Sequence, residues 1–111
     1  NKVQSRTYAR KALQVKPSYG KAYLLIASLY GSSINECGTT QFEKRAVYWL
    51  AAQYCDKAAA ADSTLKGKAS SDAARYRAAA PTKTEIFTED KAGQRIAFNC
   101  WIGESVVVPS L

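Results

Sequence analysis

The sequence predicts a mainly α fold: an antiparallel helix-pair superhelix closed by a C-terminal β-hairpin. Apolar residues recur at helical spacing through residues 1–80, and part of that segment is similar to a later part at a constant offset. The last third of the chain changes to an alternating period, which is typical of strands. At 111 residues the chain is long enough for one core. We therefore expect helical repeats over 1–80 and, over 81–111, a tail packed on the helices.

The positive charge is concentrated near the N-terminus. Residues 1–35 carry six Lys and Arg side chains and no Asp or Glu, so they account for +6 of the formal charge of +7. Such a segment is typical of a solvated helix face or of a surface that meets a polyanion. Nucleic acid is the less favoured polyanion, because no Gly-rich loop, aromatic stripe or zinc pattern accompanies the charge.

The chain has no apolar run long enough to predict a membrane span, and no signal peptide opens it. It also begins without Met inside a predicted helix. We therefore expect it to be part of a longer or processed protein.

Two segments align at an offset of 46 residues, 10–30 with 56–76. The identical pairs are Lys11 with Lys57, Ala12 with Ala58, Ala27 with Ala73, and Tyr30 with Tyr76. Small residues at such positions let helices approach closely, while tyrosines fill the gaps between successive pairs.

The aligned positions resemble the tetratricopeptide repeat, whose first helix has the order W-x2-L-G-x2-Y. Here the corresponding stretch is Tyr23-x2-Ile26-Ala27-x2-Tyr30, and Pro17 fits the end of a preceding helix. Positions typical of a second helix and of a third, weaker repeat follow at Ala51, Cys55, Ala58, Ala69, Asp72, Ala73 and Tyr76. The resemblance implies stacked antiparallel helix pairs.

The offset of 46 exceeds the repeat length of about 34 residues, so about twelve residues are extra. We place this insertion at about 32–45, between the two helices of one repeat. Thr40 and Glu43 form a capping box that begins the second helix, which leaves Cys37 in a loop over 32–39.

The tail begins at Pro81, which breaks the helix. Thr82 and Glu85 form a second capping box and predict a short helix over 83–90. Alternating apolar residues over 96–102 predict a strand, a tight turn is expected at Gly103 and Glu104, and 105–108 is the expected partner strand. Because an isolated hairpin is marginal, we expect Trp101 and Val106 to Val108 to dock on the helices.

The chain also resembles the C-terminal region of secreted bacterial tetratricopeptide-repeat proteins, which close with a Tyr-rich helix, a Pro-Thr segment and a CWI-x-E-(S/T)-x-V hairpin. The corresponding stretches run from Tyr76 to Thr82 and from Cys100 to Val108. The resemblance implies a scaffold that holds a partner without catalysis, in an extracytoplasmic location, periplasmic or secreted.

Catalytic and metal-binding patterns are lacking. The chain has no histidine, and its three cysteines fit neither a zinc site nor a CxxC redox motif. We predict no enzyme activity, no metal and no cofactor. Cys55 is expected to be a buried free thiol. For Cys37 and Cys100 we hypothesise a disulfide between inserted loop and tail; the alternative is three free thiols in a cytoplasmic protein.

The function predicted from these patterns is a protein- or peptide-binding scaffold, whose concave wall is lined by the first helix of each pair. The partner is another protein, a peptide or upstream repeats of the same chain. The candidate binding residues are Lys21, Leu24, Ser28, Lys68, Ala74 and Arg77. Two alternatives remain open: polyanion binding through the basic N-terminal helices, and a structural cap on a longer solenoid.

Overall fold

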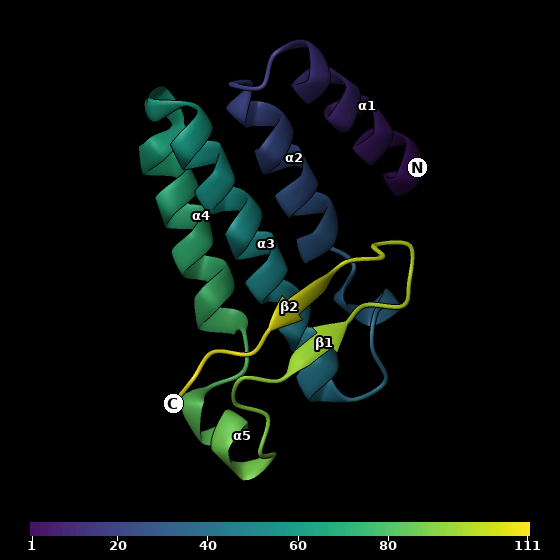
Figure 1. The fold of residues 1–111 in the computed structure, drawn as a ribbon, viewed down its shortest axis with the longest axis vertical. Helices are drawn as coiled ribbons and strands as arrows, with labels where there is room; N and C mark the ends of the chain where they lie inside the picture. Colours follow the sequence, from purple (N-terminus) through teal and green to yellow (C-terminus); the bar gives the residue numbers. More distant parts are fainter.

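Four long helices follow one another in an up-and-down order, and a small hairpin lies beside their lower half (Figure 1). The computed structural model describes residues 1–111. Its helices are α1 (Lys2–Val15), α2 (Gly20–Gly31), α3 (Gln41–Ala61), α4 (Lys66–Ala79) and α5 (Lys83–Thr88), with 3-10 turns η1 (Ile34–Glu36) and η2 (Ser63–Leu65). The strands are β1 (Arg95–Ala97) and β2 (Ser105–Val107). A mainly α fold with a C-terminal hairpin is thus confirmed.

Local sequence signals begin the helices where they were predicted. Thr40 accepts a hydrogen bond from the Glu43 amide while the Glu43 carboxylate accepts one from the Thr40 amide, so the first capping box is formed. Thr82 and Glu85 make the same pair of bonds at α5, which ends at Thr88, two residues before the predicted end. None of the helices is both long and apolar enough to cross a bilayer.

Small residues let the long helices pack closely. Helix α3 contacts both α2 and α4, and its buried surface includes Ala51, Ala52 and Ala58. Gly31 of α2 lies against Tyr76 of α4, where an added Cβ atom would lie 2.6 Å from the Tyr76 ring. Gly31 therefore allows α4 to come against the end of α2, which brings these two helices to opposite sides of one surface depression.

The hairpin is shorter than predicted. Strands β1 and β2 are antiparallel, with Ile96 opposite Val106. The predicted strand over 96–102 is wrong beyond Ala97, because residues 98–104 form a loop closed by two hydrogen bonds between the backbones of Phe98 and Gly103 or Glu104. The expected tight turn at Gly103 and Glu104 is therefore a wider loop.

Strand β1 ends early because the loop over 98–104 buries neighbouring side chains, which a strand would place on opposite faces. Phe98 and Ile102 are buried, as an alternating strand would have them, yet Trp101 is also half-buried against the helices. A flat strand cannot turn neighbouring side chains to one core. Val106 and Val108 are buried in the same core, whereas Val107 points to solvent.

Candidate functional site

A groove runs between α2 and α4 with α3 as its floor. We call it the α2/α4 groove. Its upper part has a volume of about 450 Å³ and is lined by apolar side chains including Leu24, Leu25 and Leu65. A second hollow of about 390 Å³ shares Ser28, Arg75 and Tyr76 with the first and continues to Ser32 and Ala79. The two hollows form one depression along the parallel helices α2 and α4.

Cations outnumber acids along this groove. Asp72 is the single acid in its lining, and it is held by Lys68 at 3.1 Å and by Arg75 at 3.0 Å. The Arg75 guanidinium also lies 5.1 Å from the ring centroid of Tyr76. Lys21, at the upper end, makes no ion pair. The groove therefore has an apolar interior and a net positive edge.

The floor of the groove is uncharged near neutral pH. Cys55 is a free, buried thiol, as predicted. Burial, followed by the nearby Asp72 and Asp56 carboxylates, raises the pKa of Cys55 to about 11. A thiol with such a pKa is almost wholly protonated at pH 7, and it is a poor nucleophile. Burial also raises the pKa of Tyr76, so its hydroxyl stays neutral.

The structure brings four of the six predicted binding residues together. Lys21, Leu24, Ser28 and Lys68 all line the α2/α4 groove. Ala74 and Arg77 do not line it, and Arg77 instead pairs with Asp56 of α3.

Sequence reasoning also missed groove residues on α4, such as Arg75. The helical period starting from Lys68 identifies them, because Asp72 and Arg75 follow at four and seven positions, on the same face.

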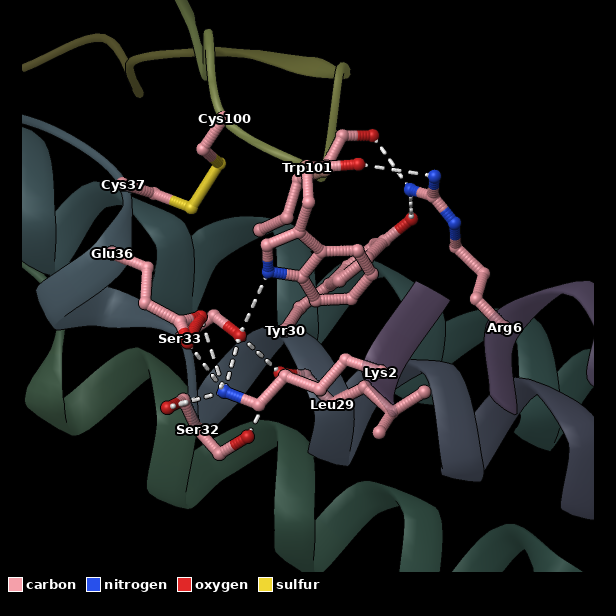
Figure 2. Close-up of a disulfide and its surroundings, with 11 residues drawn as sticks. Lys2, Arg6, Leu29, Tyr30, Ser32, Ser33, Glu36, Cys37, Cys100 and Trp101 are labelled. Carbon is pink, nitrogen blue, oxygen red and sulfur yellow. Dashed lines mark hydrogen bonds and ion pairs between the residues drawn. A yellow bond between two sulfur atoms is a disulfide. The ribbon is translucent and has the colours of Figure 1, made fainter. Parts of the chain in front are cut away.

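The opposite side of α2 carries a second cluster, which we call the tail anchor. It consists of Cys37, Cys100, Trp101 and Glu104 with the groups that bind them. Cys37 and Cys100 form a disulfide with an S–S distance of 2.09 Å, which ties the loop between α2 and α3 to the tail (Figure 2). This is the pair hypothesised from the sequence.

Two basic residues of α1 bind this cluster, Arg6 at the tail and Lys2 at the loop after α2. Arg6 donates to the backbone carbonyls of Ile102 at 2.6 Å and Trp101 at 3.0 Å, and its guanidinium lies 4.9 Å from the Trp101 ring centroid (Figure 2). Lys2 donates to Glu36 and to the buried Ser33 hydroxyl, which also accepts from the Trp101 indole N–H. These bonds join α1, the loop between α2 and α3, and the tail.

Glu104 completes the tail anchor from the other side. The hydroxyls of Tyr30 and Tyr54 both donate to its carboxylate, and Arg10 lies 3.6 Å from it. Burial, followed by the hydrogen bond to Glu104, raises the pKa of Tyr30 and of Tyr54. No buried side-chain nitrogen or oxygen of the chain lacks a hydrogen-bond partner. The tail anchor thus satisfies its own polar groups, as a structural element does.

No family model, curated protein or solved structure matches this chain. Nor do three or more His, Cys, Asp or Glu side chains come together as ligands of a metal ion would.

Proposed function

We propose that the protein is a non-catalytic binding scaffold, and that the α2/α4 groove takes an extended, acidic segment of a partner protein. The observation that carries the proposal is the composition of the groove. It combines an apolar interior at Leu24, Leu25 and Leu65 with an unpaired cation, Lys21. Apolar side chains of a ligand would fill the interior, while its carboxylates would meet the positive edge.

The dimensions of the groove suit a peptide. Ser32 lies eleven positions after Lys21 and directly follows α2, a rise of about 16 Å at about 1.5 Å per helical residue. An extended chain rises about 3.3 Å per residue, so about five ligand residues would fit. The helices α2 and α4, which run in the same direction (Figure 1), line the two sides of the groove, and this arrangement is compatible with the first helices of two successive tetratricopeptide-like repeats.

Polyanion binding through α1 is a weaker proposal. Lys2 and Arg10 are paired with Glu36 and Glu104, and Arg6 is occupied by the tail carbonyls. Half of the six basic residues before position 35 are therefore engaged within the chain, Arg6 and Arg10 with the tail and Lys2 with Glu36.

The tail also supports a structural role beside recognition. Its disulfide and hydrogen bonds cover one side of α2, which suits a cap on a longer solenoid. Such a disulfide also favours an oxidising location, periplasmic or secreted, which labelling of free thiols in the protein isolated without reductant would test.

A selection from a library of random linear peptides, displayed on phage, tests the groove proposal. Selected peptides should be rich in Asp and Glu, and Leu24→Glu should weaken their binding at least about tenfold, because it puts a negative charge against the ligand. Val107→Glu is the matched control, since Val107 is 48% exposed on β2, away from the groove.

Failure to enrich acidic peptides, or equal binding by the two Glu variants, would contradict the proposal. Binding that survives Leu24→Glu but falls steeply with salt would favour polyanion binding instead.

A further inference from the structure

A third hollow lies between α1 and α2 and adjoins the α2/α4 groove. We call it the α1/α2 hollow. It has a volume of about 200 Å³, and its lining is apolar except for Lys21, with Tyr8 and Ala12 from α1, Leu25 from α2, and Tyr19 directly before α2. Lys21 and Leu25 also line the α2/α4 groove. The two depressions therefore share one ridge on α2 and form one continuous surface.

The apolar side chains around this hollow are unusually accessible. Tyr8 is 69% exposed, Leu25 is 42% exposed and Tyr19 is 41% exposed. Large apolar side chains that gather at one surface hollow mark an interaction site more often than scattered ones do. Tyrosine is also the residue type that most often anchors a partner, because its ring is large and its hydroxyl stays hydrated.

The surroundings of the hollow are positively charged. Lys11 lies 5.8 Å from the Tyr8 ring centroid, and neither Lys11 nor Lys16 nor Lys21 makes an ion pair. One acid, Asp62, lies near Lys16 and Lys21: hydrogen bonds from Thr64 lower the pKa of its carboxyl most, and the two lysines lower it further. A second copy of the chain, with its own charge of +7, would bring like charges together here. Charge complementarity instead selects a ligand with carboxylates beside an apolar side chain.

We propose that the α1/α2 hollow is a second subsite for the same partner segment, and that it takes an aromatic or branched aliphatic side chain. The segment crosses the α2 ridge in extended form, with its acidic residues at Lys21 and along the α2/α4 groove. The inference rests on the proposed function, because it extends that site across Lys21 and Leu25.

The geometry sets the spacing of the two ligand features. Neighbouring packed helices lie about 8–10 Å apart, so depressions on the two sides of α2 are separated by about that distance. An extended chain covers it in about three residues. The recognised pattern is therefore an acidic residue and a large apolar residue about three positions apart. Since the acidic residue and the apolar residue belong to one segment, binding of one raises the effective concentration of the other at its subsite.

Selections from one library of random linear peptides against three proteins test the inference. The proteins are the unmodified chain, the double variant Tyr8→Ala/Tyr19→Ala, and the control Phe87→Ala. Phe87 is 74% exposed on α5, so the control removes an accessible aromatic ring outside both depressions. Thermal melting shows that each variant is folded, and the single variant Tyr8→Ala replaces the double variant if that one melts early.

The unmodified chain and Phe87→Ala should both select acidic peptides with an apolar residue about three positions from an acid. The double variant should still select acidic peptides but lose the apolar preference, and it should bind peptides selected on the unmodified chain about tenfold more weakly.

If the double variant selects the same peptides with the same affinity, the second subsite is wrong and the proposal for the α2/α4 groove is unaffected. If the unmodified chain selects no acidic peptides, both proposals are wrong. A dimer in sedimentation that Tyr8→Ala dissociates would also overturn the inference, because a second copy would then fill the hollow.

Discussion

Helix α2 has two sides with opposite properties. On one side Tyr30 is fully buried and its hydroxyl is bound by Arg6 and Glu104 in the tail anchor. On the other side Leu24 and Lys21 line open depressions, and Lys21 makes no ion pair. A surface whose polar groups are already paired within the chain offers a partner few groups to bind. A surface with accessible apolar side chains and unpaired charges offers more.

This difference separates stability from recognition. Substitutions in the tail anchor should lower the free energy of unfolding, whereas substitutions at the α2/α4 groove should change binding at almost constant stability. The predictions below test whether the two sides are as independent as their contacts suggest.

The largest expected effect comes from the disulfide. It joins residues 63 positions apart, and a crosslink over such a loop stabilises by about 4 kcal/mol in the chain-entropy model. The double variant Cys37→Ala/Cys100→Ala should lose a large part of that free energy in chemical denaturation. Cys55→Ala, which removes a thiol but no crosslink, is the comparison variant. A loss below about 1 kcal/mol for the double variant would mean that the tail is held without its disulfide.

Arg6→Met should have the next largest effect, because it removes the charged donor that binds the carbonyls of Trp101 and Ile102. Bonds of this kind contribute about 1.5–3 kcal/mol, so we expect a loss of about 2 kcal/mol. Lys11→Met on the same helix is the matched control, since Lys11 makes no ion pair, and should stay within about 0.5 kcal/mol. Equal losses for the two variants would show that α1 does not hold the tail through Arg6.

The tail anchor also predicts a loss of stability in alkali. Burial and the Glu104 carboxylate raise the pKa of Tyr54 and Tyr30 above the ordinary tyrosine value of 10.0. Above that pH the unfolded chain releases protons that the folded chain still holds, so the free energy of unfolding falls as the pH rises. The stabilisation should therefore be complete below about pH 10 and be lost above it.

The measurement is the difference in unfolding free energy between the unmodified chain and Tyr54→Phe as a function of pH. The difference should shrink above about pH 10, because Phe has no proton to lose. A difference that is constant up to pH 12 would rule out the buried Tyr54 hydroxyl as its source.

The smallest effect on stability is expected at the groove. Lys21 is exposed and unpaired, so Lys21→Glu should change the free energy of unfolding by less than about 0.5 kcal/mol. The same substitution should strongly weaken the binding of selected acidic peptides, because it reverses the charge of a side chain that lines both depressions. Unchanged peptide affinity would remove Lys21 from the site.

Features that depend on neighbouring residues could be predicted from the sequence, whereas features that depend on tertiary packing could not. Both capping boxes follow from residues three positions apart, so they were predicted correctly. The predicted continuation of the strand beyond Ala97 was wrong, because Trp101 packs against the core and the alternating pattern of the sequence does not indicate this contact.

The residues by which α4 lines the α2/α4 groove were likewise only partly predictable from the sequence. Which side of α4 faces α2 depends on how the helix is rotated about its axis, and the contact between Gly31 and Tyr76 that accompanies this rotation is tertiary. Ala74 and Arg77 were chosen without that contact, and they lie outside the α2/α4 groove. Lys21, Leu24 and Lys68 lie within it.

The central claim is that a partner segment binds the open side of α2 and leaves the tail anchor untouched. A titration of the ¹⁵N-labelled protein with a selected acidic peptide, followed by amide chemical shifts, tests it most directly. Shift changes should concentrate in residues 21–32 and 65–79, extend to Tyr8 and Tyr19, and be absent from 98–104. Changes centred on residues 98–104 and the disulfide, with α4 unaffected, would contradict the claim.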